Sequence, residues 1–292
     1  MINFKLFLKG AAMGCADLIP GVSGGTIALI TGIYEELIDS IRSIDAKALK
    51  LLSSFKLKEL WHHVNGPFLL HVFAGILLSI FSLSSLITYF LHDHPIPLWS
   101  FFFGLILVSA FYVMPRKRGM DVIFFTILGM LSAYLITSLT PSATSDQLWF
   151  IFISGAIAIC AMILPGISGS FILILLAKYE FILHAVKTLD VKVILTFGVG
   201  CVVGLLSFSK LIHWLLKNHK SITMSALAGF MLGSLNKIWP WKLESDFSFT
   251  NLTPSEFTES TGEPNQLMAA IIFFIIGGGV VFLLERIGRT AE

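Results

Sequence analysis

Long apolar runs constrain the fold of this chain more than any other feature of its sequence. Six runs carry almost no charged side chains: 67–91, 98–114, 121–139, 193–216, 221–239 and 267–286. About 20 apolar residues are enough for a helix to cross the hydrocarbon core of a bilayer, and such a helix satisfies its own backbone hydrogen bonds. Only 13% of the 292 residues are charged, too few to cover a soluble domain. We therefore predict an all-α integral membrane protein.

The chain also contains an internal repeat. Residues 10–38 align without gaps on residues 155–183, at a constant offset of 145, with 11 identities in 29 positions. The shared part includes Pro-Gly-x-Ser-Gly, followed ten residues later by Tyr-Glu, a pattern that apolar composition alone would not produce. Further matches, such as Ser82 with Ser207, continue at an offset of 125. We divide the chain into repeat 1, residues 1–140, and repeat 2, residues 148–292.

The positions of Lys and Arg predict the orientation, because cytoplasmic loops are enriched in these residues. The loops at 42–62, 116–118 and 217–220 carry cations and are predicted inside, whereas those at 92–97, 140–147 and 240–266 are predicted outside. These loop assignments are consistent with one another only if segments 3–40 and 148–188 each enter and leave the membrane on the same side. We therefore predict two inverted repeats, each a re-entrant helical hairpin plus three transmembrane helices, with both termini cytoplasmic. A broken spanning helix is the alternative for either hairpin.

The net charge and the motifs of the sequence argue against several classes of function. A net charge of +2, with no basic run longer than 116–118, argues against a nucleic-acid surface. The three cysteines lie in apolar segments without metal-type spacing. Motifs typical of hydrolases, phosphate-binding loops or dinucleotide folds are missing from the sequence, so we expect neither an enzyme nor a cofactor. The first residues, around Lys5 and Lys9, are interpreted as mature chain rather than as a signal peptide.

The two Pro-Gly-x-Ser-Gly turns form the predicted substrate site. In each turn Pro and Gly end one helix, and Ser23 or Ser168 caps the next, whose first N–H groups are left unpaired. Helix N-termini favour anions, and paired half-helix ends near the membrane centre are typical of secondary transporters. The predicted binding residues of the turns are Pro20, Gly21, Ser23, Gly24, Gly25, Thr26, Pro165, Gly166, Ser168, Gly169 and Ser170. The alternative is that the turns are helix breakers whose small residues allow tight packing.

Asp17 is the ionisable residue nearest to a turn. It lies three residues before Pro20, and Met162 occupies the equivalent position in repeat 2. Charged side chains inside membrane segments are costly and are usually functional. We predict that Asp17 couples transport to an ion or orients the substrate; the alternative is a cap on loop amides.

Four more ionisable residues are included in the predicted site. Glu35 and Glu180 lie at the far ends of the two hairpins, with an interfacial position as the alternative. Lys178 is predicted to neutralise a phosphate or to pair with Glu180, although its side chain is also long enough to reach the membrane surface. Lys210 lies inside the run 193–216 and is the best candidate for a membrane-embedded cation.

Residues 14–26, together with 32–35, closely resemble the bacterial polyprenyl-phosphate transporter family, long catalogued as a domain of unknown function. The second turn, residues 164–170, is similar to the repeat of that family. The resemblance covers essentially the whole chain. It implies a protein of the bacterial cytoplasmic membrane that returns undecaprenyl phosphate, the lipid carrier of envelope polymers, from the outer to the inner leaflet.

Other functions remain compatible with the sequence. A secondary transporter of a small anion or other solute could use the same paired turns. A membrane enzyme acting on lipid phosphate would need a nucleophile or a metal set, and a scaffold would need larger soluble loops than those at 40–66 and 240–266. Proton coupling, sodium coupling and no coupling are all compatible with the sequence, as are a monomer and a homodimer.

Overall fold

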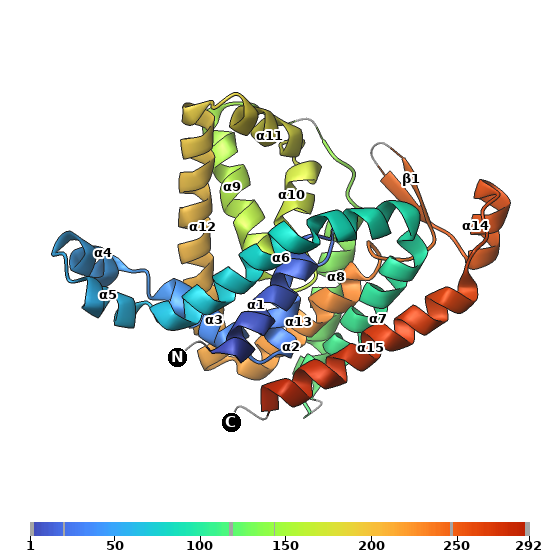
Figure 1. The fold of residues 1–292 in the computed structure, drawn as a ribbon, viewed down its shortest axis with the longest axis horizontal. Helices are drawn as coiled ribbons and strands as arrows, with labels where there is room; N and C mark the ends of the chain where they lie inside the picture. The colour runs from blue at the N-terminus through green and yellow to red at the C-terminus, as the bar shows by residue number, and fades with distance from the viewer. Residues whose placement is uncertain (1–2, 20, 117–118, 143, 246–247, 290–292) are drawn as a thin grey trace.

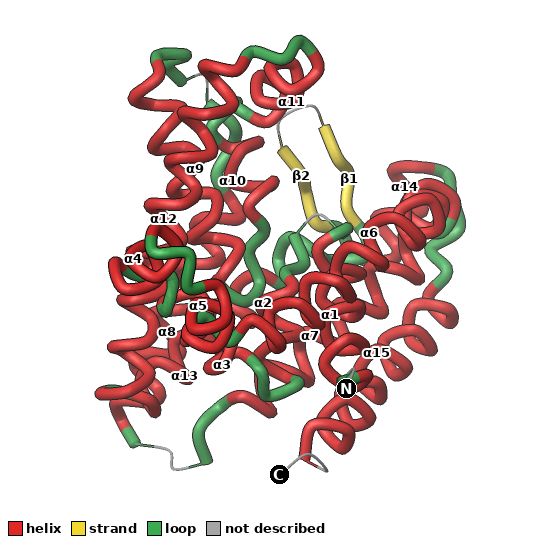
Figure 2. Tube along the Cα trace, turned by 60° about the vertical axis from the view of Figure 1, so that its left-hand side comes forward, coloured by secondary structure: helices red, strands yellow, loops and turns green. Residues whose placement is uncertain are grey.

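The computed structural model describes residues 3–19, 21–116, 119–142, 144–245 and 248–289, which form helices and one small β-hairpin (Figures 1 and 2). The elements in chain order are α1 (Phe4–Asp17), α2 (Gly24–Ile30), α3 (Tyr34–Arg42), α4 (Ala46–Ser53), α5 (Leu57–His63), α6 (Gly66–Asp93), α7 (Pro95–Val113), α8 (Met120–Ser138), α9 (Leu148–Ile163), α10 (Gly169–Leu175), α11 (Tyr179–Lys187), α12 (Val191–Asn218), α13 (Lys220–Ser234), β1 (Lys242–Ser245), β2 (Ser248–Asn251), α14 (Pro254–Thr261) and α15 (Leu267–Arg289). Five described helices, α6, α7, α8, α12 and α15, are long and apolar enough to cross a membrane. The chain is therefore a multi-pass helical membrane protein.

The predicted span 221–239 differs from the structure. Its helix, α13, has 15 residues and ends at Ser234. After Ser234 the main chain tightens, because Lys237 N–H donates to the carbonyl of Ser234 and Ile238 N–H to that of Leu235. Pro240 follows and has no N–H with which to continue a helix. Five of the six predicted spans therefore correspond to described helices that are long and apolar enough to cross a membrane.

The all-α prediction was wrong for the loop 240–266. Strands β1 and β2 pair antiparallel there, with Lys242 opposite Asn251 and Glu244 opposite Phe249. The pairing extends by one further bond, from Leu252 N–H to the carbonyl of Trp241 at 2.9 Å. An isolated two-stranded hairpin is only marginally stable in water. Packing of the residues on either side of its strands against the helices therefore stabilises it.

The second arm of each predicted hairpin is bent. The break between α2 and α3 lies at Gly32, with φ +74°, and the break between α10 and α11 lies at Ala177, with φ +51°. Helices α10 and α11 are inclined by 105°, which fits either a broken span or a re-entrant loop. The re-entrant interpretation therefore stays a prediction.

The bounds of the helices follow the offsets of the sequence repeat. Helices α2 and α10, and likewise α3 and α11, begin and end 145 residues apart, and α6 and α12 do so at 125. Helices α4 and α5, which project from the side of the helical body, lie in the insertion that changes the offset (Figure 1). The boundaries of the two repeats and their inverted relation stay predictions.

Glycines allow the closest helix crossings. Helix α1 packs on α6 and α9 on α12, whereas α7 packs on α15 and α8 on α13, so that the second pair of crossings joins the two predicted repeats. At the crossing of α7 and α15, a Cβ on Gly104 would overlap the carbonyl oxygen of Phe274, and one on Gly277 would overlap that of Phe101. Small residues at such crossings let helix backbones approach closely in a membrane.

The variant Gly277→Ala should destabilise the protein, because its methyl group has no room against the backbone of α7. Overpacking of this kind costs about 1–3 kcal/mol. Gly279→Ala is the matched control, since nothing lies within 4 Å of a Cβ at that position. Thermal unfolding in detergent should show a lower midpoint for Gly277→Ala only, and equal midpoints would contradict the close crossing.

Candidate functional site

The two predicted turns lie against each other in the interior of the molecule. The Ser23 hydroxyl donates to the carbonyl of Met162 at 3.2 Å, and the Gly166 N–H donates to Thr26 Oγ1 at 3.0 Å. Ser23 and Thr26 are completely buried. Both hydrogen bonds connect residues that are about 140 positions apart, so they join the turn of repeat 1 to the turn of repeat 2.

The start of α2 is capped from within the protein. Asp17 Oδ1 accepts a hydrogen bond from Gly24 N–H at 2.6 Å, and Ser23 Oγ accepts one from Gly25 N–H at 3.1 Å. A carboxylate at this position is favoured by the positive end of the helix. Asp17 therefore occupies the place where an external anion would bind to α2, which is the geometry of the amide cap considered above.

Among the described residues, no carboxylate caps the start of α10. Ser168 Oγ accepts from Phe171 N–H at 3.2 Å and lies 3.1 Å from Ser170 Oγ. The residue equivalent to Asp17 is Met162, whose side chain is apolar and exposed. The two turns are thus alike in backbone shape and different in charge.

Both turns require glycine after the proline position. Gly21 has φ +88° and Gly166 has φ +89°, a region that residues with a Cβ rarely adopt. Pro165 and Gly169 are buried beside them. The predicted site residue Pro20 lies outside the described residues.

The other predicted charges lie elsewhere. Glu35 is exposed and pairs with Lys220 at 2.6 Å, and Glu180 is exposed as well. Lys178 is buried, and it pairs with Asp146 at 2.5 Å rather than with Glu180.

Lys210 lies on an exposed face of α12. The structure shows no hydrogen bond or ion pair of its side chain with any described residue, so it is not brought to the turns. Within the described ranges, no three His, Cys, Asp or Glu side chains come together as a metal ion would need.

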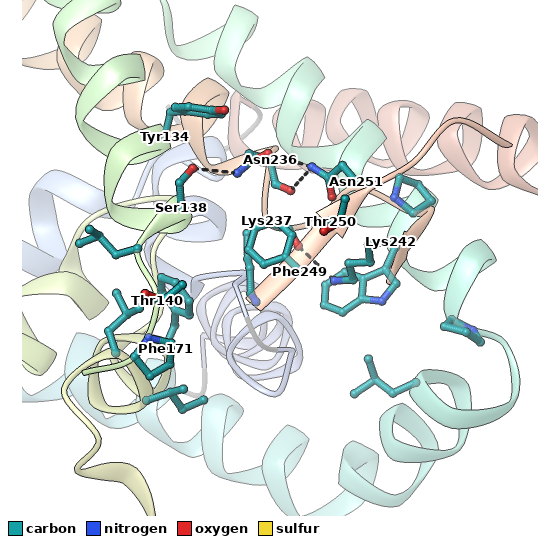
Figure 3. Close-up of a pocket in the computed structure, with 18 of the residues that line it drawn as sticks. Tyr134, Ser138, Thr140, Phe171, Asn236, Lys237, Lys242, Phe249, Thr250 and Asn251 are labelled. Carbon is teal, nitrogen blue, oxygen red and sulfur yellow. Dashed lines mark hydrogen bonds between the residues drawn. The ribbon is translucent and has the colours of Figure 1, made fainter. Parts of the chain in front are cut away.

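A cavity of about 930 Å³ lies next to the turns. It is enclosed by the start of α7, the end of α8, α10 and the chain from α13 to β2 (Figure 3). Asn236 connects two sides of the cavity by hydrogen bonds. It donates to Ser138 Oγ at 3.4 Å and accepts from Asn251 at 2.8 Å. Side chains from both predicted repeats therefore surround this space.

Two lysines line the cavity among aromatic rings. The Lys237 ammonium lies 5.2 Å from the centre of the Phe171 ring and 4.3 Å from that of Phe249. The Lys242 ammonium lies 3.7 Å from the centre of the Trp99 ring. Such contacts stabilise a cation near apolar surface. Neither lysine was among the predicted site residues, although Lys237, like Lys210, is a cation inside a predicted span, 221–239.

The cavity and the turns are in direct contact. A Cβ on Gly21 would lie 3.1 Å from Lys237 Cγ, and one on Gly166 would lie 2.6 Å from Ser234 Oγ. The short segment 234–238 therefore packs against both turns and carries a cavity lysine. The turns and the cavity form one candidate site.

The variant Thr26→Val should weaken the junction of the turns. Valine keeps the shape of the side chain but leaves the buried Gly166 N–H without its acceptor, at a cost of about 1–3 kcal/mol. Thr196→Val is the matched control, because Thr196 donates only within α12. A lower unfolding midpoint for Thr26→Val alone is the expected result; equal midpoints would show that the bond does not support the fold.

Comparison with known proteins gives the chain relatives over almost its full length. The model of the undecaprenyl phosphate translocase-like family matches residues 13–253. A polyprenyl-phosphate transporter of Vibrio cholerae is 46% identical over 299 aligned positions, covering 98% of this chain and 97% of the relative. One from Staphylococcus aureus is 35% identical over 309 positions, covering 98% and 96%. No solved structure matches the chain. These relatives confirm the resemblance seen in the turns, and the chain belongs to the undecaprenyl phosphate translocase-like family.

Proposed function

We propose that this protein moves undecaprenyl phosphate, or a similar polyprenyl phosphate, across the bacterial cytoplasmic membrane from the outer to the inner leaflet. The observation that carries the proposal is the junction of two helix-breaking turns beside a cavity with two lysines. The names of the two relatives, both polyprenyl-phosphate transporters, support the substrate class and argue against an enzyme.

The chemistry of the substrate explains why such a site is needed. A phosphate monoester carries a charge of about −1.5 to −2 at neutral pH, and the hydrocarbon core that it must cross is about 30 Å thick. Burial of an unpaired charge in an apolar medium is prohibitively costly. Lysine ammonium groups and backbone N–H donors reduce this cost, while the apolar tail can stay in the bilayer.

We further propose that the phosphate passes the paired turns, with Asp17 as the residue that it must displace. The Asp17 carboxylate occupies the start of α2, and a phosphate is attracted to the same donors. Protonation of Asp17 would remove its charge and favour the exchange. This competition supplies a physical route for proton coupling. Imposing a proton gradient, and in a parallel experiment a sodium gradient, on the proteoliposomes described below distinguishes proton coupling from sodium coupling.

Transbilayer movement of a labelled polyprenyl phosphate in proteoliposomes tests the function. The wild-type protein should accelerate movement above protein-free vesicles. Asp17→Asn should slow it about tenfold, because an amide cannot regain the charge with which Asp17 reclaims the start of α2 and expels the phosphate, and a charge-assisted hydrogen bond is worth about 1.5–3 kcal/mol. Asp121→Asn is the control, since Asp121 is exposed at the start of α8.

Three outcomes of this assay would change the proposal. Movement no faster than in empty vesicles would reject a lipid translocase and favour a transporter of small anions. An unchanged rate for Asp17→Asn would reject the role of Asp17 alone. Slow movement by a folded Lys210→Met variant would place Lys210 on the substrate route, as the sequence analysis expected.

The direction of movement is tested in cells. Removal of the protein should raise the amount of polyprenyl phosphate that a membrane-impermeant phosphate-binding probe detects at the outer surface. The wild-type gene should reverse this increase, and the Asp17→Asn variant should not. A decrease on removal would show movement from the inner to the outer leaflet.

A further inference from the structure

The lysine-containing cavity lies at one end of the molecule. Figures 1 and 2 both place α11 and the β-hairpin at the end opposite to the two chain termini. The cavity wall includes residues of the loops 92–97, 140–147 and 240–266, and all three loops are predicted to lie outside. With cytoplasmic termini, the cavity is therefore on the outer side of the membrane.

Lys242 is hydrogen-bonded to the main chain of Lys237. Lys242 Nζ donates to the main-chain carbonyl of Lys237 at 3.1 Å, so one side chain supports the backbone that bears the other (Figure 3). Each ammonium group has three N–H donors and a full positive charge. Ammonium groups attract the negative charge of a phosphate monoester, and charge-assisted hydrogen bonds of this type are among the strongest in proteins.

The rest of the cavity suits the first part of an isoprenoid chain. Trp99, Phe171 and Phe249 surround the lysines, and Ile174 and Leu175 of α10 continue the apolar wall. The volume of about 930 Å³ is in the upper part of the range for small-molecule sites. A neutral or cationic solute would gain no charge attraction from the ammonium groups, and a free inorganic anion would gain no apolar contact with the rings.

We propose that this cavity is the loading site for the lipid on the outer side, where Lys237 and Lys242 bind the phosphate and the aromatic rings contact the first isoprene units. This inference rests on the proposed function. It adds a second place at which the phosphate binds, before the buried turns.

The contacts of the segment 234–238 link this loading site to the turns. The stem of Lys237 packs on Gly21, and Ser234 packs on Gly166. The proposed loading site is therefore in direct contact with both turns.

Binding of farnesyl monophosphate to the purified full-length protein in detergent tests the site. Lys237→Met and Lys242→Met should each weaken binding about tenfold or more, and Lys237→Arg should retain most of it because the charge remains. Lys192→Met is the control, because Lys192 is exposed on α12 and belongs to the same predicted side. Farnesol and inorganic phosphate should bind at least tenfold more weakly than farnesyl monophosphate to the wild type.

Amine labelling of the wild-type protein, read by mass spectrometry, gives a second measurement that needs no variant. Farnesyl monophosphate should protect Lys237 and Lys242 from acetylation and leave Lys192 unprotected. Wild-type-like binding by both methionine variants, or equal labelling with and without the ligand, would overturn the loading site.

The same variants separate this inference from the proposed function. If proteoliposomes move lipid while the lysines neither bind nor are protected, the translocase stands and the loading site fails. If farnesyl monophosphate binds at the lysines but no lipid moves, the site stands and the translocation fails.

Discussion

The structure depends on two hydrogen bonds, one buried and one partly buried, that join the turns of its two halves. Ser23 donates to the carbonyl of Met162, and Gly166 donates to Thr26. Broken helices expose backbone donors and acceptors, which hydrocarbon cannot satisfy. In each turn, the other turn and its own serine supply partners for these groups.

The same junction explains why two similar turns can have different roles. Asp17 neutralises the start of α2, whereas Met162 leaves α10 without a carboxylate. Lys237, one of the two cavity lysines, lies beside Gly21, the glycine of the turn that Asp17 caps. The negatively charged cap repels an incoming phosphate, whereas the Lys237 ammonium attracts it. The proposed transport uses this opposition, because release of one anion makes room for the other.

Crossings between the halves keep the junction in place. Helix α7 crosses α15 at Gly104 and Gly277, and α8 crosses α13 at Gly129 and Gly229. In lipid there is no hydrophobic driving force between helices, so close backbone contact supplies much of the attraction. The third long helix of each predicted repeat thus packs on the opposite repeat, and neither half can separate without breaking these contacts.

The sequence by itself determined the membrane class, the duplication, the two turns and the family resemblance, because apolar run length and a repeated Pro-Gly-x-Ser-Gly are local features. It also placed Ser23, Thr26, Gly166 and Ser168 in the candidate site. Only the tertiary structure decided which charges meet the turns: Asp17 caps α2, Lys178 pairs with Asp146, and Lys210 stays on an exposed face. Lys237 and Lys242 come together with Trp99 and Phe171 from distant segments. Such proximity arises from helix packing, which local sequence patterns do not encode.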